Sequence, residues 1–154
     1  MNLTKGLLNL LILALLAACG KDDVADKSNV FECVLDGEKY EVEGLFAYAT
    51  KFETDNTVGI YGLQDESGEN SIIVSIPDEG ETKNYTMDGN TEGAYGIVNL
   101  KGTVYLTSLE DGAGEVELTK VSETQIEGTF SFTAYDGSGN KVEVKAGEFK
   151  VEIR

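Results

Sequence analysis

The chain has no histidine and no tryptophan, one proline and only two cysteines. Without histidine there is no imidazole base, no Ser-His or Cys-His nucleophile and no His-ligated zinc or haem. Positive charge is also scarce, with 12 Lys+Arg against 28 Asp+Glu and a formal net charge of −16. Such a chain repels phosphates and lacks a basic patch, so we expect no nucleic-acid partner. No cofactor-binding motif is present, and we expect no cofactor.

The 154 residues suffice for one domain preceded by a leader. Residues 1–6 carry a short positive start, and Leu7 to Ala18 are apolar except for Asn9. This layout is typical of a secretory signal. Twelve helical residues rise about 18 Å, against roughly 30 Å of hydrocarbon, so the segment is too short for a permanent membrane span. We predict that residues 1–18 are a removable signal peptide.

The end of this leader, Leu16-Ala17-Ala18-Cys19, resembles the lipobox of bacterial lipoproteins. The resemblance implies that a signal peptidase recognises Leu16, Ala17 and Ala18, and that Cys19 receives palmitate-type acyl chains and becomes the mature amino terminus. Two or three chains, at about 0.8 kcal/mol per buried methylene, make attachment to a membrane effectively permanent. The alternative is an ordinary signal peptide followed by a chance cysteine.

Residues 19–29 comprise Cys19 and an acidic tether; the ten residues after Cys19 have no apolar period and extend at most about 35 Å. Within it, Lys21-Asp22-Asp23 resembles the export signal that sends Bacteroidetes-type lipoproteins to the outer face of the outer membrane. The alternative is a solvated spacer, since charge keeps linkers extended. We therefore expect a lipid-anchored outer-membrane protein that faces the cell exterior, or the periplasm if the trio is only a spacer.

From residue 30 to residue 154 the dominant hydrophobic period is two, as in half-buried β-strands. The clearest case is residues 125–135, where one face carries Ile126, Phe130, Phe132 and Ala134, with Gly128 also among the inward positions. The same alternation places on inward faces Phe31, Cys33, Leu35, Ile72, Val74, Ile76, Val104 and Leu106.

Turn residues, of which Asp36-Gly37 is the clearest hairpin signal, separate these runs at intervals of about 8 to 12 residues. The pattern predicts roughly ten sequential antiparallel strands, with a weak helical pattern only near 46–52. A change of phase near Ala146-Gly147 predicts a bulge there. The fold class is all-β, a single antiparallel β-sandwich or a flattened meander barrel. Cys33, which alternates with core positions, reads as a small core residue rather than a functional thiol.

The segment Gln125 to Ile153 resembles the carboxyl-terminal signature of a family of small Bacteroidetes lipoproteins of unknown function. Phe31 to Tyr40 is similar to the opening hairpin of that family. The resemblance implies an extracytoplasmic β domain and supplies no activity. The positions that carry the signature are Ile126, Gly128 to Phe132, Val142, Val144, Gly147 and Phe149.

Two groups of residues are candidate sites. Asp136, Ser138 and Asn140 have the first spacings of a calcium loop, but Lys141 stands where such a loop needs Gly, which favours a plain hairpin. Weak calcium binding by acids of separate loops stays open; examples are Asp88, Asp111 and Glu115. A second group, the tyrosines, could stack sugars, with two of them, at 105 and 135, expected to face outward; the seven are Tyr40, Tyr48, Tyr61, Tyr85, Tyr95, Tyr105 and Tyr135.

These observations favour a non-enzymatic binding or accessory module, anchored in the membrane, with a glycan or a protein as its ligand. The alternative is an acidic inhibitor of a cationic partner such as a lytic enzyme, which strong negative potential would attract. A hydrolase that uses two carboxylates is less favoured, because the sequence singles out no such pair.

Overall fold

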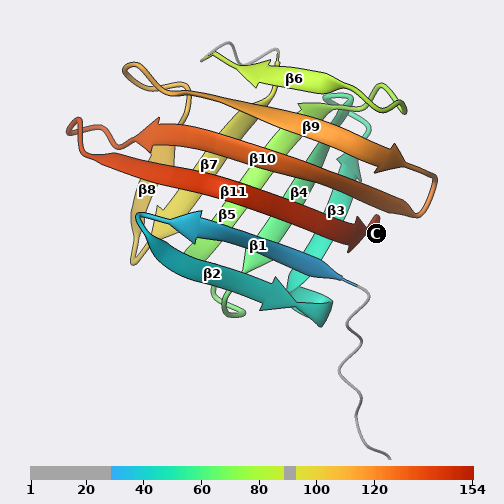
Figure 1. Cartoon of the computed structure of the whole chain (residues 1–154), viewed down its shortest axis with the longest axis horizontal. Helices are drawn as coiled ribbons and strands as arrows, with labels where there is room; N and C mark the ends of the chain where they lie inside the picture. Colours follow the sequence, from blue (N-terminus) through green and yellow to red (C-terminus); the bar gives the residue numbers. More distant parts are fainter. Residues whose placement is uncertain (1–28, 89–92) are drawn as a thin grey trace, which may run out of the picture.

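A computed structural model describes residues 29–88 and 93–154. The predicted signal peptide, the lipobox Leu16-Ala17-Ala18-Cys19, the tether and the Lys21-Asp22-Asp23 trio lie outside the described residues. The described residues form eleven strands and one 3₁₀ turn, which Figure 1 shows in place. Their bounds are β1 Val30–Leu35, β2 Glu38–Glu43, η1 Gly44–Phe46, β3 Ala47–Phe52, β4 Thr57–Leu63, β5 Asn70–Pro77, β6 Asn84–Met87, β7 Tyr95–Leu100, β8 Thr103–Leu106, β9 Ala113–Val121, β10 Gln125–Tyr135 and β11 Lys141–Glu152.

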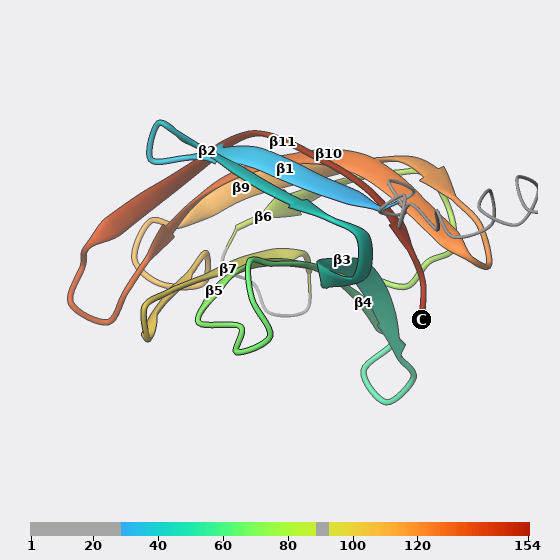
Figure 2. The same cartoon turned by 90° about the horizontal axis from the view of Figure 1, so that it is seen from below.

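The strands form two layers that cross at an angle, one in front of the other in Figure 1 and one above the other in Figure 2. One layer has six strands in the order β2-β1-β11-β10-β9-β6, and the other has five in the order β3-β4-β5-β7-β8. Every pair of neighbouring strands is antiparallel. The predicted all-β antiparallel fold is confirmed.

The two layers join at both sides, which makes the sheet a nearly closed, flattened barrel. On one side β10 meets β8 through a single pair, Tyr135 with Leu106. On the other side an isolated parallel bridge links Ala49 of β3 to Ile153. The structure thus combines the two predicted alternatives, since it is layered like a sandwich and closed like a barrel. Within the described ranges no helix is long and apolar enough to cross a bilayer.

Aromatic rings fill the space between the layers. Phe31 of β1 lies 4.9 Å from Phe130 of β10, between ring centroids, and Phe149 of β11 adjoins Phe130 at 6.1 Å. Gly62 of the opposite layer admits the ring of Phe31, because an added Cβ at Gly62 would lie 2.4 Å from Phe31 Cδ1. Cys33 is buried in this core, at 3% exposure, as predicted.

Local chain geometry also follows the sequence at several points. Asp36 and Gly37 both have positive φ, of 49° and 90°, in a two-residue hairpin turn between β1 and β2. The predicted bulge near Ala146-Gly147 is present: Phe130 pairs with Gly147 and Phe132 with Val144, so β11 contains one residue more than β10. Ala146 adopts a φ of 49° there.

Two strand predictions are wrong. Val104 and Leu106 face outward, with Val104 48% exposed, whereas Tyr105 packs against the core. The reason is register: Tyr105 pairs with Val98, whose side chain is fully buried, so the short strand β8 takes its phase from β7 rather than from its own apolar residues.

The weak helical pattern near 46–52 is the second error. This stretch is strand β3, paired with β4 along its whole length, and only Gly44–Phe46 form a single 3₁₀ turn. Ala47 and Ala49 are fully buried, so alternate small residues point into the core. Pairing with a neighbouring strand overrides the weak helical preference of this segment.

Candidate functional site

The outer face of the five-stranded layer carries no charged side chain at its outward strand positions. These positions alternate along each strand with the buried core residues, and their register across the sheet is continuous. We call this surface the tyrosine face. It comprises Tyr48, Thr50, Phe52, Thr57, Gly59, Tyr61, Leu63, Ser71, Ile73, Ser75, Pro77, Tyr95, Ile97, Asn99, Val104 and Leu106.

Exposed apolar side chains concentrate at this layer. Among the described residues, four large hydrophobic side chains are exposed. Phe52, at 41%, and Val104, at 48%, belong to the tyrosine face, while Leu45, at 76%, and Phe46, at 37%, lie on the turn that leads into β3. By register, Phe52 and Val104 stand at opposite corners of the face, so these side chains border it rather than form one patch.

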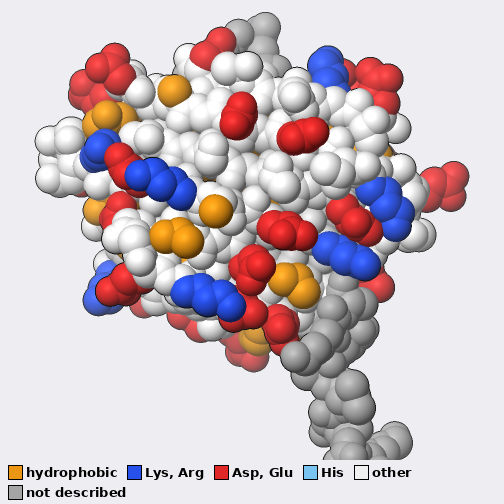
Figure 3. All heavy atoms as spheres, viewed as in Figure 1, with side chains coloured by type: hydrophobic (Ala, Val, Ile, Leu, Met, Phe, Trp, Pro, Cys, Tyr) orange, Lys and Arg blue, Asp and Glu red, His pale blue; other side chains and the backbone are white. Residues whose placement is uncertain are grey.

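The outer face of the six-stranded layer is different, since charged side chains of both signs are spread over it (Figure 3). Glu143 there bridges Lys141 and Lys145, and Glu127 bridges Lys120 and Lys150. The outer face of β11 therefore carries paired charges of both signs. Exposed ion pairs of this kind add little stability but keep a surface soluble.

The tyrosine face contains a fixed stack of three planar groups. Tyr48 and Tyr61, directly paired across β3 and β4, stack with ring centroids 4.9 Å apart and an interplanar angle of 12°. The guanidinium of Arg154 lies 5.1 Å from the Tyr48 centroid, and its Nη1 donates to the Leu45 carbonyl at 3.1 Å. On the other side, the Tyr61 ring covers Gly59, where an added Cβ would lie 2.8 Å from the Tyr61 hydroxyl. The rings are thus held in place before any ligand arrives.

Beside this stack the face is hollowed by a shallow pocket of about 200 Å³. Strand register explains the hollow: Gly59, Ser75 and Tyr95 form one row across β4, β5 and β7, so small residues separate the Tyr61 ring from Tyr95. Partial burial, with Tyr48 and Tyr95 close by, raises the pKa of Tyr61. The lining residues are Phe52, Asp55, Thr57, Tyr61, Ile73, Ser75, Tyr95 and Ile97.

A second hollow, of about 650 Å³, opens between the layers where the β1–β2 and β7–β8 hairpins meet. Tyr40 lines it and links the two layers, because its hydroxyl donates to the carbonyls of Gly62 at 2.8 Å and Asn70 at 3.2 Å. Charges of both signs stand around it, including Lys39, which is paired with Glu41.

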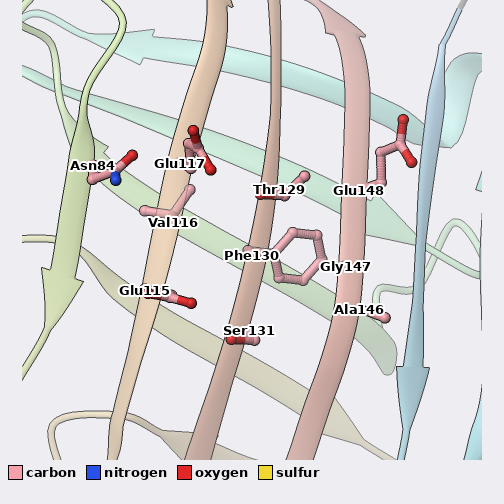
Figure 4. Close-up of a pocket in the computed structure, with 10 residues that line it drawn as sticks. All are labelled: Asn84, Glu115, Val116, Glu117, Thr129, Phe130, Ser131, Ala146, Gly147 and Glu148. Carbon is pink, nitrogen blue, oxygen red and sulfur yellow. The ribbon is translucent and has the colours of Figure 1, made fainter.

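A third hollow, of about 370 Å³, lies on the outer face of the six-stranded layer. Figure 4 shows Glu115 and Glu117 on β9, Thr129 on β10 and Glu148 on β11 around it. The hollow forms because β11 carries no large side chain at the bulge near Ala146 that could fill it. Three of the lining residues are acids, and among the described residues that line the hollow there is no Lys or Arg.

A family comparison matches residues 28–151 to a domain of unknown function, DUF6252. The chain belongs to this family. The predicted resemblance to a family without assigned activity is confirmed at that level. Comparisons with curated proteins and with solved structures find no match. The DUF6252 assignment supplies no chemistry, so function has to be argued from the sites themselves.

In this DUF6252 chain the calcium-loop candidate is the β10–β11 hairpin. The Asp136 carboxylate folds back into its own turn, where it accepts hydrogen bonds from the backbone N–H groups of Ser138 and Asn140 and from Asn140 Nδ2, all at 2.8 Å. These bonds lower the pKa of Asp136. Within the two described ranges, no group of three or more acidic or cysteine side chains has metal-site geometry.

The seven tyrosines of the DUF6252 chain divide between three environments. Tyr48, Tyr61 and Tyr95 come together on the tyrosine face, and Tyr135 lies outward on the other layer. The other three belong to the core, where Tyr40 and Tyr85 are buried and Tyr105 is partly buried. The expectation that Tyr105 faces outward is wrong, since it packs against the core. The sequence gives no direct signal that Tyr48, Tyr61 and Tyr95 meet, because they lie on three separate strands and the sequence does not reveal the order of those strands.

Cys33 offers no reactive thiol. Its burial raises the pKa of the Cys33 thiol to about 12, with a smaller contribution from the charge of Glu32. A thiol with so high a pKa is protonated and inert at neutral pH. The interpretation of Cys33 as a core residue holds.

Proposed function

We propose that this chain is a lipid-anchored cell-envelope lipoprotein whose β domain is a non-enzymatic binding module, and that it contacts its ligand through the tyrosine face. One observation carries the proposal. Charged residues make up 26% of the sequence, so a sheet face of this size would ordinarily carry several, yet none occupies its outward positions. Solubility alone would favour charge there, so the exclusion points to a surface kept for contact.

The envelope placement is supported by the amino-terminal sequence. An apolar leader ends at the lipobox Leu16-Ala17-Ala18-Cys19, and Lys21-Asp22-Asp23 follows two residues after the cysteine. We propose that acylated Cys19 anchors the chain in the outer membrane and that the Lys-Asp-Asp trio directs it to the outer face, in the manner of Bacteroidetes lipoproteins. The acidic tether then lets the domain stand off the lipid surface.

Footprinting on intact cells tests the contact surface. Hydroxyl radicals should oxidise Tyr61 and Tyr95 much less in the cell envelope than in the purified full chain in detergent, because a ligand covers them. Tyr135, half-buried on the other layer, is the internal control and should react equally in both samples. Equal oxidation of Tyr61 and Tyr95 in cells and in detergent would show that nothing covers the face and would refute the proposal.

Two variants test the placement separately. Cys19→Ala should leave the chain unprocessed or release it from membranes, and unchanged membrane partition would rule out the lipid anchor. Replacing Lys21, Asp22 and Asp23 together by Ala should preserve lipidation but abolish digestion by protease added to whole cells. If mutant and parent are digested equally at the surface, the trio is only a spacer.

The acidic hollow on the six-stranded layer favours a second candidate, an inhibitor of a cationic protein. Glu115, Glu117 and Glu148 line one groove, which suits an inserted Lys or Arg side chain. Affinity for a basic lytic enzyme would then collapse between low and high salt, whereas binding through the uncharged face would not. A hydrolase gains no support: the pKa shifts of Asp65, Asp136 and Glu143 are all downward, whereas a general acid needs an upward shift.

A further inference from the structure

We propose that the hollow between Tyr61 and Tyr95 binds one ring of a neutral glycan chain. This inference rests on the proposed function, because it names the class of ligand that the tyrosine face would contact. It goes further in assigning a position, a chemical class and a size to that ligand.

The size of the hollow suits a single sugar ring. Its volume of about 200 Å³ is below the roughly 300–1,000 Å³ of pockets that enclose a drug-sized ligand. The row from Gly59 through Ser75 to Tyr95 spans two inter-strand spacings, or about 10 Å. Because the hollow is shallow and lies on an open sheet face, a longer chain can continue across the sheet on either side.

The lining combines apolar surface with a few hydrogen-bonding groups. Tyr61 and Tyr95 offer ring surface, and Ile73 and Ile97 of the neighbouring row add aliphatic surface. Sugars present C–H groups on the faces of the ring and hydroxyls at its edge, so they match a site of this kind better than a purely apolar ligand does.

The polar groups stand at the floor and the rim. Thr57 and Ser75 contribute hydroxyls, and Asp55, on the loop between β3 and β4, contributes a carboxylate. Within the described part of the chain, these three side chains and the hydroxyls of Tyr61 and Tyr95 have no hydrogen-bond partner. They are thus available to donate to, or accept from, sugar hydroxyls.

The charges in and around the hollow favour a neutral glycan over an anionic one. Among the described residues no Lys or Arg lines the hollow, and Asp55, the acid that does, together with the net charge of −16 repels uronate or sulfate groups. The cation next to the stack, Arg154, is held by the Tyr48 ring and the Leu45 carbonyl on the far side of Tyr61. An anionic sugar would find no counter-charge in the site.

Calorimetric titration tests the inference, with cellohexaose, xylohexaose and mannohexaose as neutral probes and hexagalacturonate as the anionic one. The full chain in detergent should bind at least one neutral hexasaccharide, with little dependence on salt, and should not bind hexagalacturonate. Tyr95→Ala should weaken the binding by about tenfold or more, because it removes one aromatic wall. Tyr135→Ala, on the opposite layer, is the matched control and should bind as the parent does.

Four results would overturn the inference: no binding of any neutral hexasaccharide, equal affinity of Tyr95→Ala and the parent, tighter binding of hexagalacturonate, or sedimentation as a dimer that Tyr95→Ala dissociates. The last would mean that a second copy covers the face. Tyr95→Phe guards against a folding defect, since it keeps the ring and should retain most of the affinity. Protection of Tyr61 and Tyr95 on cells, combined with failure of every hexasaccharide, would leave the binding face standing and remove only the glycan.

Discussion

Two glycines of one strand allow a glycine-to-alanine substitution to be placed either in the core or on the tyrosine face. Gly59 and Gly62 both lie in β4 with neighbours on each side, but Gly62 faces the core and Gly59 faces outward. A Cβ at Gly62 would lie 2.4 Å from Cδ1 and 2.7 Å from Cγ of Phe31. A Cβ at Gly59 would lie 2.8 Å from Cε2 and the hydroxyl of Tyr61.

The expected magnitudes differ because the two rings differ in freedom. Phe31 is fully buried and packs on Phe130, so Gly62→Ala overpacks a closed space at a cost of about 1–3 kcal/mol. Replacing a strand glycine by alanine returns about 0.5–1 kcal/mol of backbone entropy. We expect a net loss of about 1–2 kcal/mol, or about 4–8 °C in Tm for a domain of this size.

Gly59→Ala should change stability by no more than about 0.5 kcal/mol, because the added Cβ meets only the outer end of the Tyr61 ring, which can shift slightly at the surface without disturbing the core. Its effect should appear in the hollow instead, as weaker glycan binding and an altered near-ultraviolet circular dichroism of the tyrosines. Urea titration of both variants and the parent, in the same detergent, measures the difference. If Gly62→Ala is as stable as the parent, or if Gly59→Ala loses as much stability, the assignment of the two faces of β4 is wrong.

Two further predictions concern titratable groups. Cys33, whose pKa burial raises to about 12, should resist a disulfide reagent at neutral pH until the protein unfolds in urea; fast labelling of the native chain would contradict its burial. Glu143, whose pKa the ammonium groups of Lys141 and Lys145 lower from 4.5 to about 2, stabilises the fold above its unfolded pKa, and this contribution is lost as the pH falls from about 4.5 to about 2. Glu143→Gln should therefore flatten the stability curve over that window, most visibly at low salt, and identical curves would show that the pairs do not persist in solution.

Much of the fold was predictable because it depends on local pattern. The alternation of Phe130 and Phe132 with polar neighbours defines one strand without reference to any other. Asp36-Gly37 fixes a hairpin by backbone conformation alone, and the insertion at Ala146 shows as a break in phase. Each of these signals is contained in a few consecutive residues.

The errors arose where both faces of a strand are apolar. In β8, Val104 and Leu106 looked like core residues because the tyrosine face is itself uncharged, and only the pairing with β7 reveals that they point outward. The candidate site was not predictable for a related reason. Tyr61 and Tyr95 lie on strands separated by β5, so their proximity depends on strand order and register, which no local pattern specifies.

The joins between the layers have a consequence for how the molecule opens. A single pair, Tyr135 with Leu106, closes one side, and one isolated bridge, Ala49 with Ile153, closes the other. Each layer has long internal ladders, so backbone amides at these two seams should exchange with solvent through small openings that leave both ladders intact. We therefore expect the seams to open locally while the curvature of each sheet, and any surface built on it, is preserved.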